Sequence, residues 1–323
     1  MNIALVCWIN DKAGMNIKEN LINSFEFNEL EEKFDNNSIY QYTINNKIIK
    51  LYTINSQHIF TDDLDKKIEA DIFVFITTHS AAEGRPSLTV HPIGNFGKAE
   101  KGGKEKTLCS TNSIFLKKIF IELNNNAKEP YEATMEGTHH GPYMEKPVLF
   151  VEIGSTEKEW VDKDAGKIIA KSVINGIGKY NNTNTMINNS TKKNDNYNEK
   201  KFNKKNSKII INNNGNLKNE NNNESKIDEN KIESLFIIGG SHYNHVANKV
   251  MLKSEFAAGH VCAKYNLENL NEALIKEAME KTIPESKFVL LDWKGLGKEK
   301  ARILEILEKN NIEFQRSDKF FEK

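Results

Sequence analysis

Seven of the eight histidines in this chain lie in five short motifs that also contain glycine, threonine, serine or a nearby glutamate. Imidazole changes its charge near neutral pH and is the commonest protein ligand for transition metals. A single such histidine is usually a half-buried structural residue, but five separate motifs weaken that explanation for the set. We therefore expect acid–base or metal-assisted chemistry. The seven are His79, His91, His139, His140, His242, His245 and His260, and only His58 lies outside them.

Two glutamates accompany these motifs. Glu136 directly precedes Gly137, Thr138 and the two adjacent histidines, and Glu152 lies in the apolar stretch 148–154. Burying a carboxylate is costly unless it is paired or bound to a metal, although exposure at a rim would also explain Glu152. A zinc-bound water with a pKa of about 7 supplies hydroxide, and a glutamate or histidine can carry its proton. The inventory predicts hydrolysis of an ester or an amide, although no HExxH zinc signature is present.

A loop at 94–104 contains four glycines and the lysines Lys98, Lys101 and Lys104. It lacks the GxxxxGK[ST] spacing of a P-loop, yet backbone amides and lysines in one loop suit a phosphate backbone or a nucleotide end. An ordinary solvated loop is an equally good explanation. Arg85 adds a cation expected near the same end of the sheet. Residues 11–16 follow the first strand, where they either line the same crevice or form a simple loop.

The elements that must position these residues are read from hydrophobic runs and periodicity. Strands are expected at 2–9, 38–44, 47–54, 71–78, 130–135, 147–153, 234–238 and 287–291, with Asn45–Asn46 as a hairpin turn. Helices are expected at 110–124 (capped by Ser110 or Thr111), 156–178, 243–253, 268–281 and 298–309. This alternation predicts an α/β fold with a central mixed sheet and helices on both faces, and each histidine motif lies at or near a strand end.

Composition limits the remaining possibilities. Residues 181–230 contain 19 asparagines among lysine, glutamate, serine and threonine, so we expect a disordered, low-complexity insertion within a single catalytic domain spanning 1–323. Lysine plus arginine equals aspartate plus glutamate at 45 each, so any RNA contact must use a local patch. Three widely spaced cysteines, the absence of a basic signal region and the absence of a long apolar run predict a cytoplasmic protein with no membrane association.

Several stretches together resemble the archaeal and plant D-aminoacyl-tRNA deacylase family. They include Thr78-His79-Ser80-Ala81, the run from Arg85 to Asn95, the run from Glu136 to Pro142, the run from Glu152 to Trp160, and Gly239 to Tyr243. The likeness extends to 11–17, 259–260 and 291–296, and covers nearly the whole chain except 181–230. Motifs this long are far more specific than any single pattern above.

The resemblance implies hydrolysis of the ester that joins a D-amino acid to the 3′ end of tRNA, which would serve chiral proofreading and tRNA recycling. It also implies a zinc cofactor, with one or two ions per chain, and a phosphorylase/hydrolase-like fold resembling peptidyl-tRNA hydrolases. D-Aminoacyl-tRNA is then the substrate, and no obligate protein partner is evident. Two alternatives stay open: a zinc amidohydrolase or carboxypeptidase acting on a small amide, and an RNA-binding module whose histidines are structural.

Roles for individual residues follow from residue type and motif. We predict Glu136 and His140 as catalytic residues. The predicted metal ligands are His79, His91, His139, Glu152 and His242. The predicted substrate or tRNA contacts are Arg85, Lys98, Lys101, Lys104, Thr138, Ser241, His245 and His260. The residues that select D over L amino acids cannot be read from the sequence.

Overall fold

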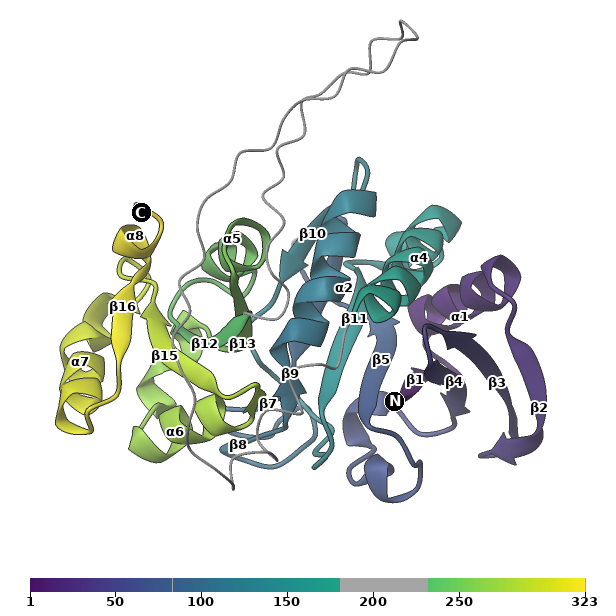
Figure 1. Cartoon of the computed structure of the whole chain (residues 1–323), viewed down its shortest axis with the longest axis horizontal. Helices are drawn as coiled ribbons and strands as arrows, with labels where there is room; N and C mark the ends of the chain where they lie inside the picture. The colour runs from purple at the N-terminus through teal and green to yellow at the C-terminus, as the bar shows by residue number, and fades with distance from the viewer. Residues whose placement is uncertain (83, 181–231, 323) are drawn as a thin grey trace, which may run out of the picture. The chain divides into compact units, whose positions relative to one another are not determined.

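The computed structural model describes residues 1–82, 84–180 and 232–322 (Figure 1). The asparagine-rich tract at 181–230, expected to be disordered, lies outside them. The strands are β1 Asn2–Trp8, β2 Asn28–Phe34, β3 Asn37–Ile44, β4 Lys47–Ile54, β5 Ile72–Thr78, β6 Ser87–Pro92, β7 Gly94–Asn95, β8 Thr107–Leu108, β9 Thr111–Asn112, β10 Glu132–Met135, β11 Val148–Gly154, β12 Glu233–Ile238, β13 Phe256–Cys262, β14 Thr282–Ile283, β15 Ser286–Leu291 and β16 Phe314–Arg316. The helices are α1 Lys12–Ser24, α2 Ser113–Asn126, α3 Glu157–Trp160, α4 Lys163–Lys179, α5 His245–Lys253, α6 Glu272–Glu280, α7 Lys300–Lys309 and α8 Ser317–Phe320.

Eight strands form the larger sheet, in the order β10-β6-β11-β5-β1-β4-β3-β2. β11, β5, β1 and β4 run parallel, whereas β6 is antiparallel to β11, and β3 and β2 form a hairpin extension. β1, β5 and β11 are rich in valine, isoleucine, leucine and phenylalanine and are buried on both faces, as expected for central parallel strands. One face packs against α1, α2 and α4, and the other against segments around 58–70 and 143–148.

Four further strands form a second sheet, in the order β13-β12-β15-β16. Alternate residues of β12 face opposite sides, so Leu235 and Ile237 join the core that contains α5, while Phe236 and Ile238 join the core that contains α6 and α7. Helix α2 contacts both β6 and β13, so it bridges the two sheets (Figure 1). The predicted α/β class with a mixed central sheet flanked by helices is confirmed.

Several local predictions are wrong in informative ways. The expected helix at 156–178 is two helices: Thr156 and Glu159 form the predicted capping box of α3, and Asp162 then caps α4. Asn112, and not Ser110 or Thr111, caps α2 through a bond from Phe115 N. Four elements were not predicted from the sequence: α1, β2, β6 and β13. His91 lies within β6 and His260 within β13, and not in loops that follow strands.

The hairpin turn at Asn45 and Asn46 is confirmed, since both residues adopt positive φ angles of 48° and 61°. Asparagine tolerates this left-handed region better than most residues, which explains a tight two-residue connection between β3 and β4. Among the helices that the structure describes, none combines the length and the apolar character needed to cross a membrane.

Candidate active site

Glu152 lies on β11 between two neighbouring strands that each supply a threonine. In register, it pairs with Thr77 of β5 and Thr89 of β6, whose hydroxyls donate to its carboxylate at 2.9 and 3.3 Å. His79 Nδ1 lies 3.3 Å and His91 Nε2 3.6 Å from Oε2. Burial opposes ionisation, but the two histidines outweigh it and hold the pKa of Glu152 well below its usual range. Glu152 is thus a buried carboxylate, not a residue at a solvent-exposed rim.

Glu136 follows β10, and its backbone forms an isolated bridge with Tyr243. Its side chain is fully buried, with His79 Nδ1 3.0 Å from Oε1, and His242 Nε2 3.0 Å and His139 Nε2 3.6 Å from Oε2. Neither carboxylate oxygen has a hydrogen bond of normal geometry among the described residues. Burial opposes ionisation here too, but His242 and His79 lower the pKa of Glu136. This carboxylate has unsatisfied acceptor capacity in the interior.

His79 connects the two glutamates, because its Nδ1 lies within 3.3 Å of both. Its Nε2 lies 2.9 Å from the Tyr243 hydroxyl, and the Trp160 indole donates to its carbonyl at 2.9 Å. Burial acts to lower the pKa of His79, but the two carboxylates outweigh it and raise that pKa to about 8. A Cβ at Gly154 would lie 2.8 Å from this ring, so only glycine fits beside it.

His91, His139 and His140 form a second group, with ring centroids 4.3 to 5.0 Å apart. In each, Nδ1 faces a backbone carbonyl: Pro92 O at 3.1 Å, Gly137 O at 2.8 Å and Gly141 O at 2.6 Å. An Nδ1–H that donates to a carbonyl leaves the Nε2 lone pair free, as in most zinc-bound histidines. Burial, followed by repulsion from His91, lowers the pKa of His140 to about 3, which favours the neutral form that binds metals.

These residues offer three overlapping sets of donor atoms that lie within 4.8 Å of one another. The sets are His91 with His139 and His140, His79 with Glu136 and His242, and His91 with Glu136 and Glu152. The orphaned oxygens of Glu136 and the orphaned Nε2 of His91 are buried atoms that a cation would satisfy. The imidazole and carboxylate donor set therefore fits zinc.

The cluster forms one wall of a cavity of about 750 Å³ that is also lined by Trp8, His58, Tyr265 and the loop after β6. Lys98 and Lys101 line this cavity, whereas the Lys104 ammonium lies over the Tyr143 ring, 3.5 Å from its centroid. The loop is anchored: Phe96 is buried on Phe236, and Asn95 donates to the carbonyls of Gly102 and Lys104.

Other residues predicted to contact substrate lie elsewhere. Arg85 is exposed and pairs with Glu132, His245 is exposed at the start of α5, and Ser241 donates to Tyr243 O. Thr138 and His260 are fully buried and bonded to each other at 3.2 Å. His260 Nε2 lies 3.0 Å from Cys109 O, and burial lowers its pKa to about 3. Both ring nitrogens of His260 have partners inside the protein, and the side chain is buried. His260 is therefore a structural residue that a substrate does not reach.

His58 was set apart in the sequence but lies at this cavity, beside Asp11. Tyr243 and Tyr265 were also missed, and they contact His79 and His242 through their hydroxyls at 2.9 and 3.0 Å. Tyr243 directly follows a motif histidine, which could have drawn attention to it. Asp11 and His58 are 47 residues apart and carry no shared local signal.

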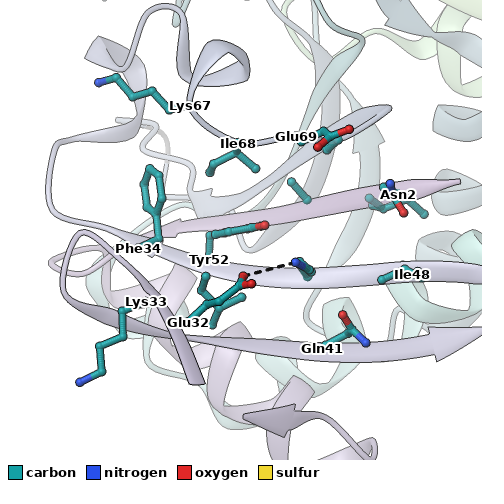
Figure 2. A pocket seen from close by; sticks show the side chains of 15 residues that line it. Asn2, Glu32, Lys33, Phe34, Gln41, Ile48, Tyr52, Lys67, Ile68 and Glu69 are labelled. Carbon is teal, nitrogen blue, oxygen red and sulfur yellow. Dashed lines mark ion pairs between the residues drawn. The ribbon is translucent and has the colours of Figure 1, made fainter. Parts of the chain in front are cut away.

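A separate cavity of about 500 Å³ lies on β1, β4 and β3, away from the histidines (Figure 2). Phe34, Tyr52 and Ile68 give it apolar walls, and Lys50 pairs with Glu32 at 3.7 Å within it. Its lining contains no histidine. It therefore lacks the donors needed for the chemistry described above.

Comparison with known proteins gives consistent results. A family model described as D-aminoacyl-tRNA deacylase matches residues 66–315. The D-aminoacyl-tRNA deacylase of Pyrococcus furiosus is 31% identical over 94% of this chain and 96% of its own length, and that of Methanosarcina mazei is 31% identical over 95% and 89%. A crystal structure described as a conserved protein of unknown function matches with a TM-score of 0.72 at 27% identity, covering 98% of this chain and 95% of its own.

Proposed function

The chain belongs to the D-aminoacyl-tRNA deacylase family, and from this premise we propose that it hydrolyses the ester between a D-amino acid and the 3′ end of tRNA at the buried histidine–glutamate cluster. The observation that carries this assignment is the convergence of His91, His139 and His140, each oriented by a backbone carbonyl, beside Glu136 and Glu152. The relatives give no support to an amidohydrolase acting on a small amide.

We propose that zinc is held by the Nε2 atoms of His91, His139 and His140. This moves His140 from the catalytic residues to the ligands. When bound there, zinc would supply an activated water and polarise the ester carbonyl. The set of His79, Glu136 and His242 offers a second group of donors. We favour the three histidines because a backbone carbonyl faces Nδ1 in each of them and so orients all three rings.

The chain's own residues then move the proton. Glu136 accepts it from the attacking water, since its oxygens lack hydrogen bonds of normal geometry. His242, 3.0 Å from Glu136 and partly exposed, can pass the proton to the departing ribose oxygen. Glu152 keeps His79 and His91 oriented through Oε2. Water is added across the ester bond, giving the free amino acid and the tRNA 3′ hydroxyl.

Chirality is the most direct test of this function. Purified protein is incubated with D-tyrosyl-tRNA and with L-tyrosyl-tRNA, and the remaining ester is counted over time. We expect the D ester to be cleaved about 100-fold faster or more, because enantiomers differ only in where the side chain points. Equal rates would contradict chiral selection. Cleavage of neither ester, with hydrolysis of a small amide, would restore the amidohydrolase alternative.

The lysines of the loop at 94–104 provide a test of tRNA binding. Replacing Lys98 and Lys101 together with alanine should weaken tRNA binding and reduce the slope of log K against log salt by roughly one unit per lost phosphate contact. Lys104→Ala is the matched control, because that ammonium faces Tyr143 and not the cavity. An unchanged slope in the double variant would show that the cavity lysines do not contact phosphate. An equal effect of Lys104→Ala would show that the loss of tRNA binding is not specific to the cavity lysines.

A further inference from the structure

Asp11 is a buried carboxylate fixed by three donors at the end of β1. Its Oδ1 accepts Gly14 N at 2.7 Å as the cap of α1, and its Oδ2 accepts both Thr78 N and Thr78 Oγ1 at 3.1 Å. Burial raises the pKa of Asp11, while these donors and His58 act in the opposite direction. Because both oxygens accept hydrogen bonds, we take the group as a carboxylate whose orientation is set by the backbone.

His58 lies between this carboxylate and the cavity. Its Nδ1 is buried, has no hydrogen bond among the described residues and lies 3.6 Å from Asp11 Oδ2. The ring is packed by Trp8 and Phe150, with centroids 6.3 and 5.6 Å away, and its accessible part, 8% of the side chain, lines the cavity. A carboxylate facing Nδ1 favours the proton on that nitrogen, so Nε2 keeps its lone pair as an acceptor.

Charge is distributed unevenly around this cavity. Asp11, behind His58, and Glu152 are buried carboxylates on this side, whereas Lys98, Lys101 and one carboxylate, Glu100, line the loop side. Burial lowers the pKa of His58 with Asp11 opposing, so the ring itself stays neutral near pH 7. Trp8 also lines this side, and an indole ring attracts a cation placed over its face. One side thus suits a cationic hydrogen-bond donor and the other suits phosphate.

We propose that His58, oriented by Asp11, binds the α-ammonium group of the aminoacyl moiety. This rests on the proposed function, which places the ester at the neighbouring histidine–glutamate cluster. His58 accepts one ammonium hydrogen, and Asp11 acts through the imidazole as a positioning residue. Once the ester and the ammonium are both held, the side chains of D and L substrates must point in different directions. A second anchor beside the ester is therefore what chiral selection requires.

The test compares two D esters of tRNA that differ only at the α-substituent: D-tyrosyl-tRNA and its α-hydroxy analogue. His58→Phe keeps a ring of similar shape without nitrogen. We expect it to reduce kcat/KM for the amino ester by about 10- to 100-fold, mainly through KM, as for loss of a hydrogen bond to a charged group. The hydroxy ester should lose less than about threefold. His58→Gln should restore part of the activity, and Asp11→Asn, which keeps a capping side chain, should show a smaller selective loss.

Four outcomes would overturn the proposal. Equal losses for both esters would show that His58 acts on a part they share, and unchanged activity would exclude any contact. Loss of bound zinc in His58→Phe would make His58 a metal ligand. If the defect disappears on tRNA ending in 2′-deoxyadenosine, the partner is the ribose hydroxyl. Failure of the wild-type protein to cleave D-tyrosyl-tRNA would instead reject the proposed function itself.

Discussion

Replacing Glu152 with glutamine is expected to reduce kcat/KM for D-aminoacyl-tRNA by about a thousandfold or more. The substitution keeps the shape of the side chain but removes the negative charge shared by His79 and His91, both of which lie within 3.6 Å of Oε2. His79 would then lose one of the two carboxylates that raise its pKa to about 8. Steady-state kinetics on D-tyrosyl-tRNA would measure the effect.

A matched control separates this effect from damage to the fold. Glu122 is also a buried carboxylate, but it pairs with Lys179 at 2.5 Å and Asn175 on the helical side of the sheet. Glu122→Gln should lower the melting temperature by a few degrees while leaving kcat/KM within about twofold. Activity of Glu152→Gln within threefold of wild type would remove Glu152 from the catalytic cluster.

The central strands were predictable because a continuous apolar run in the sequence is enough to indicate a buried strand. β1, β5 and β11 are short apolar runs that are buried on both faces, and such runs are visible in the sequence. Glu152 stands out for the same reason, as a carboxylate inside an otherwise apolar strand. β6 was missed because Ser87, Thr89 and His91 make it look polar, although every residue is buried. Thr89 and His91 are stabilised by Glu152, a contact that only tertiary structure supplies.

The site could be predicted only in part for the same reason: contacts between residues far apart in the sequence decide the role of each histidine. Motif and residue type identified His79, His91, His139, His140, His242, Glu136 and Glu152, and the structure brings all seven together. The local sequence does not distinguish His260 from His139. Both nitrogens of His260 bond to groups inside the protein, whereas the backbone contact of His139 uses only its Nδ1. His58 was not among the predicted site residues because it lies in none of the motifs, yet the segment after β4 places it at the cavity.

Removing metal should have an effect as large as the loss of Glu152. After exhaustive chelation we expect deacylation to fall by about a thousandfold or more and to return when zinc is added. In the proposed mechanism the ion would supply both the hydroxide at neutral pH and the polarisation of the carbonyl, while Glu136 and His242 would transfer protons. Metal analysis of the purified chain and of the chelated sample should accompany the kinetics. Unchanged activity in a sample shown to be free of metal would reject the zinc assignment.

Histidine variants decide which donors hold the ion, with readouts that do not depend on activity. His91→Ala and His139→Ala should each lose bound zinc, and chelation should no longer lower their melting temperatures, because a ligand stabilises only the state that binds it. His260→Gln is the matched control: this histidine is as buried as His91, but its nitrogens bond Thr138 and Cys109, so the variant should lose stability but keep zinc. Zinc lost from His79→Ala but retained in His91→Ala would place the ion between His79, Glu136 and His242 instead. Both ring nitrogens of His79 already have partners, Tyr243 at Nε2 and the two carboxylates at Nδ1, which argues against that placement, since a ligand must offer a free lone pair.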